Sequence, residues 1–208
     1  IQQIDEQAIL DVLAPGATAW VAAPLGAFVP AHSPLLWVHP ALGDDDGPTA
    51  QQLADAFALG DTRTMQQDLG FGLVQLTDIA VRALSPGVND PSTAIDVIAQ
   101  LSDVLLGLWS RAPVATTCST DDRTVVRYNV SHGEHLDRIV RSICRYGSED
   151  NDVLDALQNT LLSIRNEVLR RGLPGPLAPL DDALGTVQAE IARTQRTTRA
   201  SPTEVTPT

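Results

Sequence analysis

The polar side chains of the segment 63–94 are the ones whose types and spacing could support chemistry. The segment is otherwise apolar and helix-forming, yet it carries arginine, aspartate, asparagine and glutamine residues. Burying such groups without partners costs roughly 2–7 kcal/mol each, so we expect them either to be paired or to contact a ligand. The candidate ligand-binding residues are Arg63, Asp68, Asp78, Arg82, Ser85, Asn89 and Asp90.

Helical geometry predicts how the first of these residues are positioned. The pattern indicates a long helix near 63–84, on which Asp78 precedes Arg82 by four residues, the favourable order for an ion pair. Such a pair contributes little when exposed, but a buried pair costs about 3–5 kcal/mol when one partner is lost. The polar stripe comprises Thr64, Asp68, Phe71, Gln75, Asp78 and Arg82. The opposite, core-facing side comprises Leu69, Leu73, Leu76, Ile79, Ala80 and Ala83.

The loop that follows this helix places a hydroxyl, an amide and a carboxylate just before another helix. Pro86 and Gly87 suit the central positions of a type II turn, and Asp90 followed by Pro91 is typical of an N-cap and first helical residue. Free N–H groups at such a helix start can hold an anion, although the Asp90 side chain competes for them. Two interpretations stay open: these residues fix a turn between core helices, or they form a binding or catalytic site.

No metal site is predicted from histidine and acidic spacing. His132 and His135 bracket Glu134, but Ser131 and Glu134 match a helix capping box, which already explains the glutamate. A third ligand is not evident. We therefore predict neither a metal nor another cofactor.

Two further clusters of charge are interpreted as surface features. The run Asp44–Asp46 reads as an acidic loop, because three consecutive carboxylates cannot all turn toward one cation. A basic stripe on one helix is expected to be solvated or paired, with anion binding as the alternative. The stripe consists of Arg138, Arg141 and Arg145.

Composition excludes several classes of function. The formal net charge is −12 over 208 residues, so a nucleic-acid partner is not expected. All 14 cationic residues are arginine, which excludes every chemistry that needs a lysine. Cys118 and Cys144 are expected to be free thiols, with a single disulfide as the alternative. No run of 18 apolar residues is present to span a bilayer, and the start without methionine suggests a piece of a longer protein.

Periodicity predicts an α+β fold that is mostly α, with a helical core, a small N-terminal β element and one β-hairpin. Residues 1–45 are expected to form a short helix, with Asp5 as its N-cap, plus the β element. Residues 46–195 are expected to form a mainly helical domain, and 196–208 a disordered tail rich in Thr, Ser and Pro. The hairpin is expected within 113–130. The last helix is expected near 181–195.

The central run also resembles the signature of a bacterial family of predicted membrane proteins with no assigned function, domain of unknown function 2254. Weaker similarity at Gln3–Asp5, in the turn 26–35 and at Arg145–Gly147 extends the resemblance to about residue 172. The matching residues are Arg63-Thr64, Gln67-Asp68, Phe71-Gly72-Leu73, Leu76, Asp78-Ile79-Ala80, Arg82–Gly87, Asn89-Asp90-Pro91 and Thr93-Ala94.

This resemblance implies a membrane-bound parent whose N-terminal transmembrane helices precede a soluble region, which would be this chain. Its expected partners are the transmembrane helices of the same protein, and a homo-oligomer is left open. An even number of spans would place the region on the cytoplasmic side of the cell membrane. No catalytic residue is transferred, because the family has none assigned.

Two functional hypotheses follow. The first, which we favour, is a non-enzymatic module with a regulatory, ligand-sensing or assembly role, because the sequence lacks a complete catalytic constellation. The second is an anion-binding, small-ligand-binding or enzymatic site built on Asp78, Arg82, Asn89 and Asp90.

Overall fold

The structure of the chain, a computed structural model, describes residues 1–43, 46–111, 115–173 and 177–200. It is mostly helical with two small sheets, which confirms the expected α+β class. The chain forms two compact units. The first consists of residues 1–72 and 113–130, and the second of residues 73–112 and 131–208. The expected boundary at residue 45 thus falls inside the first unit, because the following helix packs on the N-terminal helix.

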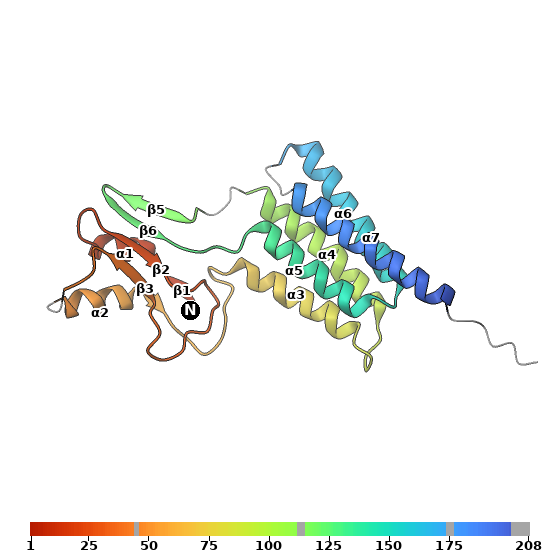
Figure 1. Ribbon diagram of the computed structural model, residues 1–208, viewed down its shortest axis with the longest axis horizontal. Coiled ribbons are helices and arrows are strands. Elements are labelled where there is room, and N and C mark those ends of the chain that lie inside the picture. Colours follow the sequence, from red (N-terminus) through yellow and green to blue (C-terminus); the bar gives the residue numbers. More distant parts are fainter. Residues whose placement is uncertain (44–45, 112–114, 174–176, 201–208) are drawn as a thin grey trace, which may run out of the picture. The chain divides into compact units, whose positions relative to one another are not determined.

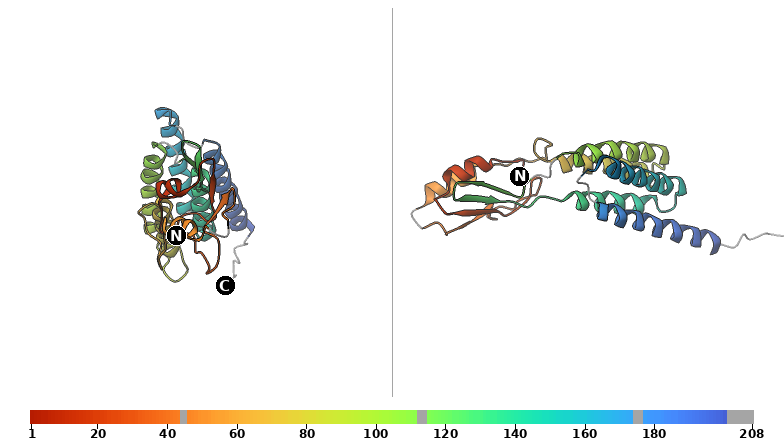
Figure 2. Two further views of the ribbon diagram at one scale, coloured as in Figure 1. Left: turned by 90° about the vertical axis from the view of Figure 1, so that its left-hand side faces the viewer. Right: turned by 90° about the horizontal axis from the view of Figure 1, so that it is seen from above.

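The first unit is built around a four-stranded sheet of order β3-β2-β6-β5 (Figures 1 and 2). β2 pairs antiparallel with β3 and parallel with β6, so the hairpin β5–β6 completes a sheet begun about 100 residues earlier in the chain. A two-stranded sheet joins β1 to β4. The elements are β1 (Gln3–Ile4), α1 (Glu6–Val12), β2 (Thr18–Val21), β3 (Leu36–His39), α2 (Gly47–Asp55), β4 (Phe57–Ala58), β5 (Thr117–Thr120) and β6 (Arg123–Val126).

Alternation along the strands separates the two faces of this sheet. Ala19 of β2 and Val125 of β6 are buried in the same cluster as Ile9 and Leu10 of α1. The Asp5 side chain caps α1 by accepting a hydrogen bond from the Ala8 N–H at 2.9 Å, as its sequence predicts. The apolar face of α1 therefore covers one side of the sheet.

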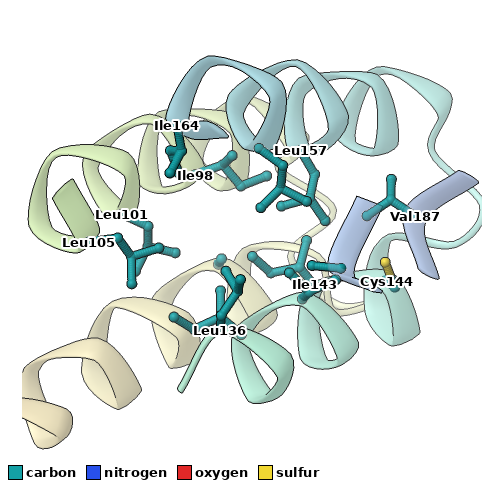
Figure 3. Packing of buried hydrophobic residues seen from close by; sticks show 14 of the residues in the cluster. Ile98, Leu101, Leu105, Leu136, Ile143, Cys144, Leu157, Ile164 and Val187 are labelled. Carbon is teal, nitrogen blue, oxygen red and sulfur yellow. The ribbon is translucent and has the colours of Figure 1, made fainter. Parts of the chain in front are cut away.

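The second unit contains helices that run side by side around a leucine- and isoleucine-rich core (Figures 1 and 3). Its elements are most of α3 (Leu69–Ala83), together with α4 (Pro91–Trp109), α5 (His132–Gly147), α6 (Asn151–Arg171) and α7 (Leu177–Ala200). The labelled core residues of Figure 3 are Ile98, Leu101, Leu105, Leu136, Ile143, Cys144, Leu157, Ile164 and Val187.

Local sequence signals explain where these helices begin and end. The predicted capping box of α5 is present, because Ser131 and Glu134 each accept a hydrogen bond from the other's backbone N–H. Asp90 and Asp150 cap α4 and α6 through their side chains. Gly172 ends α6 in the left-handed conformation, with φ of 61°.

Three expected helix limits are wrong: the start of the helix predicted near 63–84 and both ends of the last helix. The helix predicted near 63–84 begins only at Leu69, and residues 63–68 are not helical because tertiary hydrogen bonds hold them in another conformation. Leu69 and Ile79, expected in the core, are about half exposed. The last helix spans Leu177–Ala200 rather than 181–195, so residues 196–200 are helical. The rest of the expected tail, 201–208, lies outside the described residues, as do Asp44 and Asp45 of the acidic loop.

The helix α4 changes one expectation about membranes. Its 19 residues, with a mean hydropathy of 1.2, make it long and apolar enough to cross a bilayer by length and composition, alone among the helices described. Core helices of water-soluble proteins pass the same test. Here α4 places Ile98, Leu101 and Leu105 in the core of the second unit.

Candidate functional site

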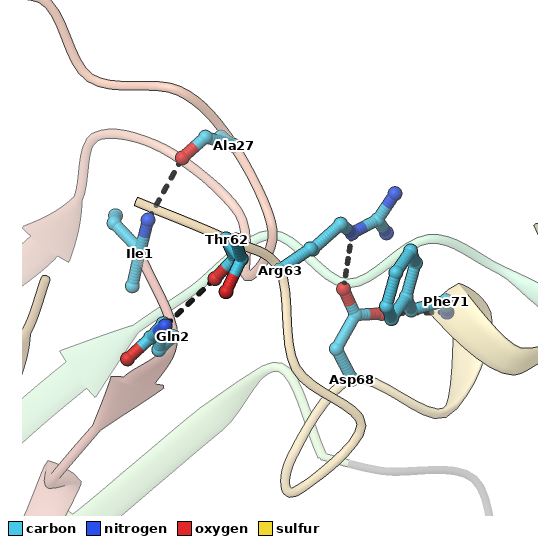
Figure 4. Close-up of polar contacts among 7 residues, drawn as sticks. All are labelled: Ile1, Gln2, Ala27, Thr62, Arg63, Asp68 and Phe71. Carbon is cyan, nitrogen blue, oxygen red and sulfur yellow. Dashed lines mark hydrogen bonds and ion pairs between the residues drawn. The ribbon is translucent and has the colours of Figure 1, made fainter. Parts of the chain in front are cut away.

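Arg63 and Asp68 form an ion pair in the first unit (Figure 4). The Arg63 Nε donates to Asp68 Oδ2 at 2.7 Å. The other carboxylate oxygen accepts the Phe71 N–H at 3.0 Å and so holds the first turn of α3. The Arg63 guanidinium also lies 5.1 Å from the centre of the Phe71 ring, within cation–π range. Since Asp68 is only 9% exposed, its charge is stabilised by these partners rather than by water.

Gly26 makes room for this pair. Its φ is +75°, a conformation that residues with a Cβ rarely adopt, and an added Cβ would collide with the Arg63 guanidinium and the Asp68 carboxylate. The Gly26 N–H donates to the carbonyl of Ile1, and the backbone nitrogen of Ile1 donates to Ala27 O at 2.8 Å. Glycine is therefore required here both for backbone conformation and for close approach.

Two glutamine side chains connect the same segment to the N-terminal residues of the chain through hydrogen bonds. The Gln67 side chain accepts the Ile4 N–H at 2.9 Å and donates to the Ile4 carbonyl at 3.2 Å. Gln2 donates its side-chain amide to Thr62 O at 2.7 Å (Figure 4). We call Arg63, Gln67, Asp68 and Gly26 the signature cluster. Each of its side-chain contacts joins parts of the first unit.

The turn between α3 and α4 uses its polar side chains locally. Asp90 accepts hydrogen bonds from the Ser92 hydroxyl at 2.6 Å and from the Thr93 hydroxyl and N–H at 2.5 and 3.1 Å. These hydrogen bonds from Ser92 and Thr93 lower the pKa of Asp90 to about 2. Ser85 donates its hydroxyl to Arg82 O at 2.7 Å and accepts the Asn89 N–H through its carbonyl.

The predicted type II turn is wrong. Gly87 is not among the described glycines with positive φ, whereas Asn89 has a φ of +48°. Asn89 therefore supplies the left-handed residue that the turn needs, a conformation that asparagine tolerates better than most residues.

The expected ion pair between Asp78 and Arg82 is absent from the described part of the chain. Both side chains are on the exposed surface of α3, and each belongs to the second unit. Sequence spacing put them within reach, but an exposed pair on one helix contributes only a few tenths of a kcal/mol, about 0.3–0.5, so little holds the two side chains together. The seven candidates thus divide into the Arg63–Asp68 pair, the turn residues Ser85, Asn89 and Asp90, and the two α3 side chains.

Asp78 instead lines a small cleft between α3 and α5, which we call the α3–α5 cleft. Its volume is about 60 Å³. From α3 it is lined by Leu73, Val74, Thr77 and Asp78, and from α5 by His135, Arg138, Ile139 and Ser142. The sequence had marked His135 and Arg138 separately, as metal and anion candidates. Their meeting with Asp78 depends on helix packing, which sequence spacing does not reveal.

His132 does not join His135 in this cleft. Its ring lies 6.4 Å from that of the buried Trp109, and burial lowers its pKa. Across the described ranges, no group of three or more His, Cys, Asp or Glu residues is placed to hold a metal ion.

A second, larger depression lies in the first unit along the edge strand β3. Its volume is about 420 Å³, and it is lined mainly by apolar residues of β3 and α2. Trp37 lines it and is 62% exposed, beside its cross-strand neighbour Trp20, which is 42% exposed.

The fold and these sites define a two-unit α+β protein whose polar residues mostly stabilise turns, caps and segment contacts. The chain belongs to the family described as predicted membrane protein (DUF2254), whose sequence model matches residues 1–163. The resemblance noted in the central run is thereby confirmed.

Relatives in mycobacteria carry no assigned function. Uncharacterized proteins of Mycobacterium bovis and of Mycobacterium tuberculosis strain H37Rv are each 41% identical to the chain over 109 residues. The match covers 51% of this chain and 21% of each relative, so the chain corresponds to a small part of these proteins. No solved structure matches the chain.

Proposed function

We propose that this chain is a non-enzymatic, extramembrane module that regulates or assembles the membrane protein to which it belongs. The proposal is supported by the contacts within the signature cluster. Arg63, Gln67 and Asp68 direct their polar groups at each other and at the backbone of β1, which is the use expected of side chains that hold segments in register.

The position of the signature cluster along the chain supports a role in coupling β1 to α3. It ties β1 to the start of α3, and along α3 the chain passes from the first unit to the second at residues 72 and 73. A displacement of the N-terminal strand would therefore pull on the first turn of α3. The partners in this proposal are the transmembrane helices of the same protein, and a homo-oligomer would offer a further interface.

A pair of matched variants of the full-length protein tests this role. Gln67→Ala removes both hydrogen bonds to Ile4, whereas Gln66→Ala alters an exposed neighbour that makes no hydrogen bond to another described residue. We expect only Gln67→Ala to change the size of the membrane-extracted complex or its resistance to limited proteolysis. Identical behaviour of both variants and the parent protein would contradict the coupling role.

We further propose that the chain lies on the cytoplasmic side of the membrane, where an even number of transmembrane helices in the parent protein would put it. Cys118 is partly exposed and Cys144 is buried, so Cys118 can report sidedness. A membrane-impermeant maleimide should label Cys118 only after cells are permeabilised. Labelling in intact cells would move the module to the outer side.

The alternative function is a ligand-binding or enzymatic site that includes Asp78, Arg82, Asn89 and Asp90. Asp78 in the α3–α5 cleft favours the ligand-binding form of this alternative, whereas Asp90 is engaged in capping α4. If Asn89 serves the turn, Asn89→Ala should lower the melting temperature and the function together. Loss of function at an unchanged melting temperature would favour a catalytic or binding role.

A further inference from the structure

We propose that the α3–α5 cleft binds a small zwitterion that carries both a carboxylate and an ammonium group, as an amino acid does. This inference goes beyond the coupling role and does not depend on it. It begins with the periodicity of the two helices. His135, Arg138 and Ser142 recur at intervals of three and four residues on α5, and Val74, Thr77 and Asp78 do so on α3. One face of each helix is therefore presented to the same small space.

Asp78 and Arg138 bring opposite charges to the two sides of this space. Within the described residues, neither Asp78 nor Arg138 makes an ion pair, although the next arginine of α5, Arg141, pairs with Asp137 at 2.6 Å. Nor are Asp78 and Arg138 within 4.0 Å of each other, the limit for an ion pair, so a bound molecule can lie between them. The Arg138 guanidinium can bind a carboxylate through two parallel hydrogen bonds, and the Asp78 carboxylate can accept from an ammonium group.

This arrangement discriminates between classes of ligand. A simple anion would gain from Arg138 but would be repelled by Asp78, and a simple cation would meet the reverse situation. Only a molecule with both charges is attracted by both walls. The hydroxyl of Ser142 adds a polar contact, while Leu73, Val74 and Ile139 supply an apolar wall that suits an aliphatic carbon.

The size of the cleft limits the ligand to the smallest members of this class. The cleft volume of about 60 Å³ is far below the roughly 300–1,000 Å³ of pockets for drug-sized ligands, so even a small molecule would be only partly enclosed. The buried Thr77 hydroxyl already donates to Leu73 O at 2.7 Å, so it is not free to donate to a ligand. Glycine and alanine are therefore the appropriate probes.

Saturation-transfer difference NMR on the full-length protein tests the proposal with glycine, alanine, acetate and methylammonium as separate probes, and with inorganic phosphate as a competitor of the glycine signal. We expect signals from glycine or alanine and at least tenfold weaker binding of the other three, because each of those engages one wall only. Because each side chain supplies one of the two charged walls, Arg138→Ala should weaken glycine binding about tenfold, and Asp78→Asn should weaken it similarly.

Arg145→Ala is the matched control, because it removes the same charge from the same helix outside the cleft. Its glycine signal should equal that of the parent protein. Three results would each overturn the proposal: no signal from either amino acid, a signal unchanged by both Arg138→Ala and Asp78→Asn, or acetate or phosphate binding as strongly as glycine. Circular dichroism of each variant ensures that a lost signal comes from a folded protein.

Discussion

Gln67 and Ile4, 63 positions apart in the chain, exchange two hydrogen bonds of 2.9 and 3.2 Å through the glutamine side chain and the isoleucine backbone. The Gln67 side-chain amide hydrogen-bonds to the N–H and the carbonyl of Ile4, as the backbone of a neighbouring strand would. It offers both a donor and an acceptor, which few side chains can do. The residues before α3 are thereby held against β1 without forming a strand or a helix themselves.

Gln67→Ala should lower the free energy of unfolding of the first unit by about 1–2 kcal/mol, because the Ile4 N–H and carbonyl lose their partners. Hydrogen exchange at the Ile4 amide measures this directly and should accelerate. Gln66→Ala should leave that amide unchanged. Equal exchange rates in the two variants would show that Gln67 does not hold β1.

Gly26→Ala should be more damaging than Gly16→Ala, although both glycines have nearly the same φ, +75° and +77°. An added Cβ at Gly16 meets nothing within 4 Å, so only backbone strain of about 1–2 kcal/mol applies. At Gly26 it also displaces the Arg63–Asp68 pair, which should add about 2 kcal/mol or more. Urea unfolding of both variants, followed by amide hydrogen exchange in the first unit, gives the comparison. Equal losses would mean that the close approach is unimportant.

Asp68→Asn should destabilise the start of α3, because the neutral amide keeps the size of the carboxylate but not its charge. The Arg63 guanidinium then loses its ion-pair partner in a largely buried setting, at a cost of about 1–3 kcal/mol. Asp61→Asn provides the control, since Asp61 is exposed in the loop before Arg63. Urea unfolding should show a loss of stability in the first variant only, and an unchanged free energy of unfolding would show that the Arg63–Asp68 ion pair contributes no stability. The Phe71 N–H keeps an acceptor in this variant, because the asparagine amide oxygen can replace the carboxylate oxygen.

Asp90 should give the protein a distinct acid dependence. Its pKa is lowered from 3.8 to about 2 in the folded chain, so the unfolded chain takes up the proton first as the pH falls. The stability that Asp90 contributes is complete above about pH 4 and is lost progressively as the pH falls to about 2. Melting temperatures of the parent protein and of Asp90→Asn should therefore converge over that interval.

The two cysteines should differ sharply in reactivity. Burial, together with the nearby Glu190 charge, raises the pKa of the Cys144 thiol to about 11, so its thiolate is scarce at neutral pH. Cys118 is partly exposed on β5. Iodoacetamide at pH 7.5 should modify Cys118 within minutes and Cys144 only when the second unit opens. Mass spectrometry of timed samples measures both rates, and equally rapid labelling would contradict the packing of α5.

The sequence predicted those features that depend on residues close together in the chain. Asp5, Asp90 followed by Pro91, and the Ser131–Glu134 box each cap the helix expected, because a cap involves only the next few residues. The strands β2 and β3 and the hairpin β5–β6 also follow from alternation and turn residues.

Features that depend on distant segments were not predictable in this way. The parallel pairing of β2 with β6 joins Ala19 to Val125, and nothing local to either strand marks the other. Residues 63–68 have helical periodicity, but their hydrogen bonds to β1 and to one another outweigh a weak local preference. The candidate residues Arg63 and Asp68 were identified, whereas their geometry was not.

The interleaving of the two units sets the order in which the first can be completed during synthesis. β2 and β3 leave the ribosome early, but the other edge of β2 stays without its partner until β6 has followed, after α3 and α4. An open strand edge is a template for incorrect pairing. A gene fragment ending at residue 72 would keep that edge open permanently, and a fragment must extend to about residue 130 before the four-stranded sheet can form.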